Sequence, residues 1–217
     1  MATYNYFSNL NFDPIQILSR VFVILCCFPV HECAHAWMAD KLGDPTPRLR
    51  GRVTLNPFKH LDLWGTVMIF LFGVGYAKPV PINIRNFKKP KAHFALTAVA
   101  GPVSNLIMAV IFMIICRFVY HGTLTQFTYN ISIFLIYAAM INLSLAVFNL
   151  IPIPPLDGSR VLTAFLPDRA YNAFLKYERY SMIILLILLL FFSRIGISPI
   201  SRITYALFNA LARLIGL

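Results

Sequence analysis

The sequence has little charge and very few acidic groups. Only 12% of its 217 residues are Asp, Glu, Lys or Arg, and only eight of these are acidic. By contrast, 59% of the residues are hydrophobic, and the mean hydropathy is +0.71. Soluble domains carry about 25% charged residues, so the composition excludes that class. We therefore expect an integral membrane protein.

Cysteine is also scarce. The four cysteines, Cys26, Cys27, Cys33 and Cys116, all lie within apolar runs, and the sequence contains no Cys-x-x-Cys pair. We expect them to be small apolar packing residues rather than disulfides or zinc thiolates. No signal-peptide cleavage site of the Ala-x-Ala type is evident, so the first apolar run is expected to remain in the mature protein.

The shortage of acidic residues leaves a net charge of +11. The Lys and Arg residues fall between apolar runs rather than along one helix face or among aromatic residues. This distribution is typical of topology signals and of contacts with lipid headgroups. The expected partner is therefore a lipid bilayer, and no nucleic acid is expected.

Several apolar runs exceed the roughly 18 residues needed to cross a bilayer. We predict an all-α polytopic membrane protein, a bundle of about four to six transmembrane helices. One domain over residues 1–217 is expected, with a core at about 15–165 and C-terminal helices in 166–217. The expected spans are residues 15–41, 92–120, 128–150 and 181–193 with flanks; residues 195–217 could be a short span or an interfacial helix.

Between the first two spans the sequence predicts a small β-strand and re-entrant element. Residues 48–55 and 80–84 alternate polar and apolar side chains, which is typical of strands. The apolar run 63–77 is short and has basic flanks, which favours a re-entrant or interfacial hairpin. The segments between apolar runs that are rich in Lys and Arg are expected on the cytoplasmic side of the membrane. The loop 121–127, which carries no Lys or Arg, is expected on the opposite side.

Two imidazoles and a carboxylate interrupt the first apolar run. His31 and His35 are four residues apart, so they share one face of a helix, as two ligands of one metal ion must. Glu32 can reach a water at that metal without being a ligand, as in helical His-Glu-x-x-His zinc hydrolases. Pro29 is expected to kink the helix just before these residues.

A third ligand is expected from Asp157. It follows a segment with three prolines, at 152, 154 and 155, which cannot continue a regular helix at membrane depth unless it lines a cavity. A buried carboxylate there requires a partner, and a cation would supply one. His31, His35 and Asp157 would leave one position for water, as catalytic zinc sites do. The weaker candidates are His60, Asp62, His93 and His121.

At this point the sequence closely resembles the site-2 protease family of intramembrane zinc metalloproteases, in its compact prokaryotic form. The matching stretches are residues 31–35, 43–46, 51–57 with 60–62, 77–81, 100–105 and 149–158. The resemblance implies a multi-pass protein of a prokaryotic plasma membrane that cleaves membrane-spanning protein substrates. It also implies one Zn²⁺ per chain, held by His31, His35 and Asp157, with a water activated by zinc and Glu32.

The resemblance marks Asn149 and Asn105 as motif asparagines. Both are candidates for hydrogen-bonding substrate or the oxyanion. Asn149 could instead brace the proline-rich loop, and for Asn105 the favoured role is structural, with its side chain bonding backbone freed by Pro102. The strand-like stretches could pair with an unwound substrate. A scaffold or metal transporter with a bound zinc is the alternative function. Glu32 argues against a scaffold, and the lack of acidic residues along the other apolar runs argues against a transporter. The oligomeric state is left open.

Overall fold

We describe a computed structural model of the chain, which is mostly helical. The described residues are 13–62, 78–120, 125–167, 169–170, 181, 183–185, 187 and 199–217. The expected hairpin at 63–77 lies outside them, as does most of the expected span at 181–193.

The first membrane-spanning segment is built from three consecutive helical pieces. They are α1 (Pro14–Phe22), the π-helical turn η1 (Val23–Cys27) and α2 (Phe28–Lys41). The Asp13 side chain caps α1 by accepting a hydrogen bond from the Ile15 N–H at 3.0 Å. The prediction that Pro29 disturbs this helix agrees with the wider turn of η1, in which the Phe28 N–H bonds the Val23 carbonyl.

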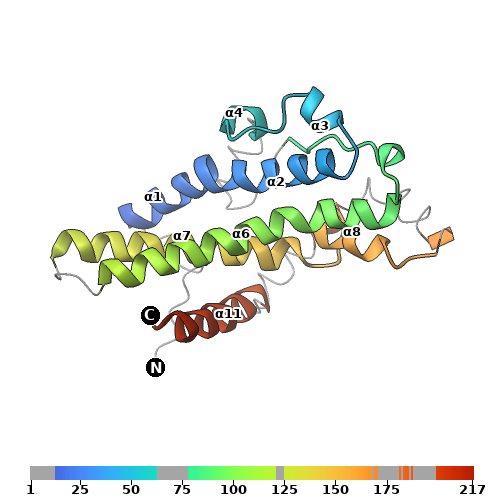
Figure 1. Ribbon diagram of the computed structural model, residues 1–217. Helices are drawn as coiled ribbons and strands as arrows, with labels where there is room; N and C mark the ends of the chain where they lie inside the picture. Colours follow the sequence, from blue (N-terminus) through green and yellow to red (C-terminus); the bar gives the residue numbers. More distant parts are fainter. Residues whose placement is uncertain are drawn as a thin grey trace.

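Two long helices pack against this segment. They are α6 (Pro90–Tyr120) and α7 (Gln126–Asn149), and Figure 1 shows them running alongside α1 and α2. Small side chains at Ala109, Ala138 and Ala139 are fully buried where α6 and α7 meet, which lets the two backbones approach closely. Cys27 and Cys116 lie in the same core as free thiols, as expected for packing residues.

Within the described ranges, three helical segments are long and apolar enough to cross a membrane, namely Pro14–Lys41, Pro90–Tyr120 and Gln126–Asn149. The larger bundle of about four to six helices is not confirmed by the described residues. The helix α11 (Pro199–Ile215) packs on α7 and α6, on the side of the bundle opposite α3 and α4 (Figure 1). Its 17 residues are at the lower limit of the about 17–25 that a membrane-spanning helix needs.

The predicted strands are not formed within the described ranges. Residues 48–55 begin in the short helix α3 (Thr46–Leu49) and continue as irregular chain to α4 (Pro57–His60). Residues 80–84 are irregular and lead into the single turn η2 (Ile84–Asn86). Within residues 48–55 only Arg52 is buried, whereas Leu49 and Leu55 are exposed, so the alternation in the sequence does not correspond to an inward and an outward face of a strand.

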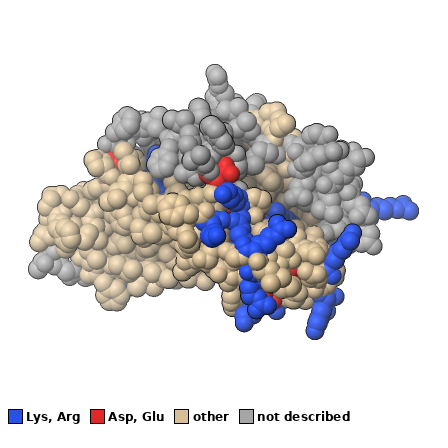
Figure 2. All heavy atoms as spheres, turned by 90° about the horizontal axis from the view of Figure 1, so that it is seen from above, with Lys and Arg blue, Asp and Glu red and all other residues tan. Residues whose placement is uncertain are grey.

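Charged side chains are unevenly distributed over the molecule. Figure 2 shows Lys and Arg side chains gathered on one part of the visible face, whereas the opposite end is nearly free of charge. The less charged end is the one where α6 ends and α7 begins (Figure 1), although α6 carries Arg117 in its last turn. This asymmetry favours a cytoplasmic location for the basic end.

Candidate metal centre

The site is built around one face of α2. His31 and His35 are both buried, and their Nε2 atoms lie 3.0 Å apart. Their rings meet edge to face, with centroids 4.6 Å apart. The spacing of four residues on a helix therefore brings two imidazole nitrogens to one point, as the sequence predicted.

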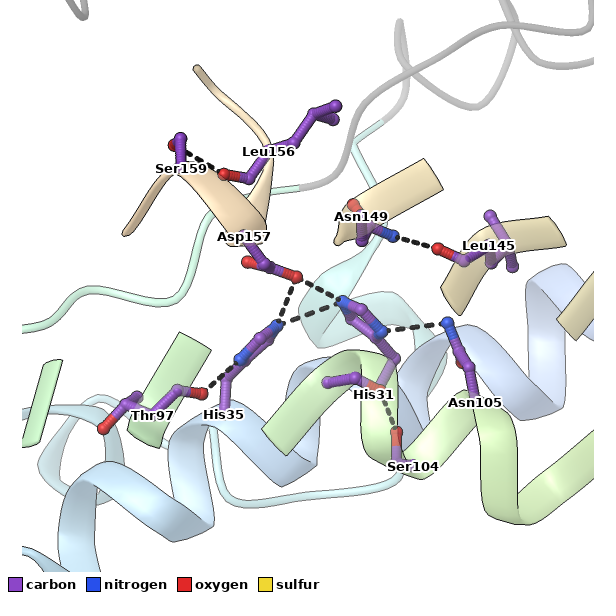
Figure 3. Close-up of polar contacts among 11 residues, drawn as sticks. His31, His35, Thr97, Ser104, Asn105, Leu145, Asn149, Leu156, Asp157 and Ser159 are labelled. Atoms are coloured by element: carbon purple, nitrogen blue, oxygen red, sulfur yellow. Dashed lines mark hydrogen bonds and ion pairs between the residues drawn. The ribbon is translucent and has the colours of Figure 1, made fainter. Parts of the chain in front are cut away.

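Asp157 completes the cluster from a distant part of the chain. It is the first residue of the short helix α8 (Asp157–Thr163), directly after the proline-rich segment. Its Oδ2 lies 3.2 Å from His35 Nε2 and 3.4 Å from His31 Nε2. Figure 3 shows the carboxylate pointing at both rings. The structure thus brings together the three residues that the sequence proposed as ligands.

Gly158 allows α8 to approach the end of α7. A Cβ at this position would lie 2.2 Å from the Leu150 carbonyl oxygen and 2.7 Å from that of Ile151. Because neither backbone oxygen can move freely, only glycine fits between them. The residue thereby fixes where α8 begins, and so where Asp157 enters the site.

Hydrogen bonds orient the two rings from behind. The Nδ1 of His35 lies 2.7 Å from the Thr97 carbonyl oxygen of α6, which can only accept, so the proton is on Nδ1. The Nε2 of His35 is then left with a free lone pair facing the cluster. On the other ring, Nδ1 of His31 lies 3.1 Å from the Asn105 side-chain amide, as Figure 3 shows.

Gly101 on the adjacent helix α6 lets that helix lie directly against the two rings. A Cβ on Gly101 would lie 2.3 Å from His35 Nε2 and 2.6 Å from His31 Cε1. One ligand atom from each of His31, His35 and Asp157 can lie within 4.8 Å of the others. Two nitrogen donors and one carboxylate oxygen form a donor set that suits Zn²⁺, so these residues fit the metal.

Glu32 lies on the same helix but outside this cluster. Its side chain is buried at the edge of the site, with 9% of its surface exposed. It interacts electrostatically with Arg52 on the loop above α2. Burial lowers the pKa of the Arg52 guanidinium and the Glu32 carboxylate raises it in part, so that the pKa stays below its ordinary value.

Sequence reasoning assigned no role to two residues that hold the loops over α2. Arg52 donates hydrogen bonds to the carbonyls of Lys59, Lys78 and Pro79, the last at 2.6 Å. Asp44 is fully buried and accepts from the backbone and hydroxyl of Thr46, the Asn83 N–H and the Asn86 amide. Both residues occur in sequence stretches that match the family, and this match is the feature of the sequence that could have pointed to them.

The weaker candidates lie elsewhere. His60 is buried and places Nε2 2.8 Å from the Thr54 carbonyl oxygen, and His93 packs edge to face on Phe87. Neither belongs to a metal-binding group among the described residues, nor does Asp62. His121 lies outside the described residues.

The two motif asparagines differ in their surroundings. Asn149 is half-buried, and its amide donates to the Leu145 carbonyl of its own helix at 3.0 Å. Asn105 is 1% exposed, and the contact given for its amide is to His31 rather than to backbone near Pro102. The prediction that Asn105 bonds that backbone is therefore replaced by a contact with a ligand ring.

A helical His-Glu-x-x-His segment completed by a distant carboxylate defines a class of metal-dependent peptidases, here with the site between membrane-spanning helices. Comparison with known proteins identifies the family. The model of peptidase family M50 matches residues 19–192. The chain belongs to this family, the site-2 protease family, and is a zinc metalloprotease.

Individual relatives agree with this assignment. "Putative zinc metalloprotease YwhC" of Bacillus subtilis is 42% identical over 77% of this chain and 78% of its own length. Rip2 of Mycobacterium tuberculosis, which carries the same designation, is 27% identical over 81% of this chain and 67% of its own. MJ0611 of Methanocaldococcus jannaschii, also so designated, is 29% identical over 72% and 75%. No solved structure matches the chain.

Proposed function

We propose that this chain is an intramembrane endopeptidase that hydrolyses peptide bonds of membrane-spanning proteins in a prokaryotic plasma membrane. The observation that carries the proposal is the convergence of His31, His35 and Asp157 between helices that are apolar enough to span the bilayer. A buried carboxylate between two buried imidazoles is costly in such surroundings unless a cation binds there.

The residues divide into ligands and a general base. His31, His35 and Asp157 would hold one Zn²⁺ per chain. When bound, the metal would be a Lewis acid that lowers the pKa of water toward about 7 and polarises a carbonyl. Glu32 takes the proton of the attacking water and passes it to the leaving amine. The burial of Glu32 beside the cluster keeps bulk water from competing for that proton.

Substrate binding is assigned to the face of the site not closed by α6. Asn149 stands at the end of α7, and Figure 3 places it across the ligand cluster from α2. Within the described part of the chain, its amide is bonded to its own helix at Leu145, so a modest rotation would free it for a substrate carbonyl. We therefore propose Asn149 for substrate or oxyanion hydrogen bonding.

A single catalytic domain over residues 1–217 is the simplest unit for this activity.

The alternative of a metal transporter requires further polar ligands along a path through the membrane. Among the described residues, His31, His35 and Asp157 are the only group with metal-binding geometry. This favours the protease over the transporter.

Replacement of the base separates catalysis from metal binding. Glu32→Gln is nearly isosteric but cannot accept a proton, so the purified variant in lipid should retain zinc while cleavage of a single-span substrate falls about 10²–10⁴-fold. Asn149→Ala is the companion variant, for which zinc should be unchanged and cleavage reduced. Cleavage by Glu32→Gln at the wild-type rate would overturn the proposed mechanism.

A further inference from the structure

The contact between Asn105 and His31 carries an inference about the metal centre. Asn105 lies on α6 one turn beyond Gly101, and its side chain is almost completely buried. Its Nδ2 is placed 3.1 Å from His31 Nδ1, while its Oδ1 is buried without a hydrogen-bond partner among the described residues. Buried amide oxygens are rarely left without a partner, so this arrangement requires an explanation.

The amide orientation determines where His31 carries its proton. If the amide nitrogen donates to Nδ1, a neutral ring must carry its proton on Nε2. That proton would then point at His35 Nε2 and Asp157 Oδ2, which lie 3.0 and 3.4 Å away. In that tautomer His31 could not offer the Nε2 lone pair to a metal ion.

Rotating the Asn105 amide by about 180° allows His31 to adopt the tautomer that can bind a metal ion. The oxygen and nitrogen of an Asn amide are assigned from their surroundings, because a rotation by about 180° exchanges two nearly identical atoms. After this rotation the Oδ1 of Asn105 accepts the Nδ1 proton of His31, and the Nε2 lone pair of His31 faces the cluster. In the rotated amide the nitrogen, instead of the oxygen, has no hydrogen-bond partner among the described residues, so both orientations make the same number of hydrogen bonds. The rotated orientation is preferred because only it leaves the Nε2 lone pair of His31 free to bind a metal ion.

His35 provides the internal comparison. Its Nδ1 faces the Thr97 carbonyl, an obligatory acceptor, at 2.7 Å. Both acceptors come from α6, and they lie behind the two rings on the side away from Asp157 (Figure 3). Metal-binding histidines generally donate their second ring N–H to such an acceptor.

We infer that Asn105 is a positioning residue that accepts the Nδ1 proton of His31 and so holds this ring in its metal-binding tautomer. The inference rests on the metal centre of the proposed function. It gives Asn105 a role in orienting His31 rather than in binding substrate. Thr97 and Asn105 then form one supporting layer on α6, with a backbone acceptor for His35 and a side-chain acceptor for His31.

The test measures zinc affinity of the full chain in lipid nanodiscs by chelator competition. Asn105→Leu keeps the side-chain volume but removes the acceptor, and zinc binding should weaken about 10- to 100-fold. Asn105→Asp presents only acceptor atoms and should bind zinc at least as tightly as wild type. Asn105→Ala, which introduces no branched side chain, replaces Asn105→Leu if that variant does not fold.

Asn142→Leu is the matched control. Asn142 is also a fully buried asparagine of a membrane-spanning helix whose Oδ1 has no partner among the described residues, but its amide bonds Ala138 on α7. This control should bind zinc as wild type does. Equal zinc affinity in Asn105→Leu and wild type would overturn the inference, as would equal losses in Asn105→Leu and Asn105→Asp or in Asn105→Leu and Asn142→Leu. Absence of zinc binding by wild type would instead overturn the metal centre itself.

Discussion

Asp157 Oδ2 lies 3.2 Å from His35 Nε2, although the two residues come from helices far apart in the sequence. The proline-rich segment ends α7 and starts α8 so that the carboxylate enters the bundle at the level of the two imidazoles. This relationship brings the three proposed metal ligands together between helices that are long and apolar enough to cross a membrane, and the first predictions concern it.

The first prediction concerns the ligands. His35→Ala and Asp157→Ala should each lose zinc, because two remaining protein ligands are too few for a catalytic site. His93→Ala is the control and should keep zinc, since His93 packs on Phe87 outside the cluster. The measurement is metal analysis of each purified variant, and full zinc occupancy in both ligand variants would exclude the site.

Gly101 provides a steric test of the same centre. A Cβ at this position would meet both imidazoles at 2.3–2.6 Å, so Gly101→Ala must displace the rings. An overpacking cost of about 1–3 kcal/mol should weaken zinc binding roughly 5- to 150-fold. Val103→Ala is the control, because Val103 on the same helix is exposed to the surroundings. Unchanged zinc affinity in Gly101→Ala would mean that the rings are not held against α6.

The cluster and the α6 contacts behind it show what the sequence could and could not predict. The spacing of His31 and His35 determines their shared helix face, and a buried carboxylate after three prolines had few possible roles, so the convergence of these three side chains was predictable. Thr97 contributes only a carbonyl, and the contact of Asn105 with His31 depends on how α6 packs on α2. Neither contact leaves a signal in residue type or spacing.

The predicted strands are not formed because the pattern of side chains does not determine the path of the backbone. Alternation reports that successive side chains face opposite sides, and the sequence pattern of residues 48–55 has this property. The backbone, however, turns at Gly51, whose φ of +64° lies outside the extended region that a strand requires. The Arg52 guanidinium binds carbonyls of the neighbouring loops and holds this region together without a sheet.

The loop anchor at Asp44 predicts a pH dependence of stability. Burial raises the pKa of Asp44, but hydrogen bonds from Thr46, Asn83 and Asn86 lower it more, so the folded pKa lies below the ordinary value of 3.8. A group with a depressed folded pKa stabilises the protein above its unfolded pKa and loses this effect as the pH falls through the folded value. The contribution of Asp44 should therefore be complete above about pH 5 and decline below about pH 4.

Asp44→Asn isolates this contribution. At pH 7 the variant should be less stable by about 1–3 kcal/mol, because an amide cannot accept all of the buried hydrogen bonds. The difference from wild type should shrink as both are acidified, which thermal unfolding at a series of pH values would measure. A difference that stays constant down to pH 3 would contradict the assignment.

The topology is tested by single cysteines in a chain without its four native ones. Labels introduced at residues 48, 85 and 88 should react from the cytoplasmic side, because the basic segments remain there. A label at residue 125, before α7, should react from the other side. Reaction of residue 125 from the cytoplasm alone would show that α6 does not cross the membrane.

X-ray absorption at the zinc edge of the purified full chain tests the central claim most directly. The account predicts one zinc per chain with a first shell of nitrogen and oxygen only, at about 2.0–2.2 Å, including two imidazoles. A chain that binds no zinc, or a first shell that contains sulfur at about 2.3 Å from the cysteines of the first span, would contradict it.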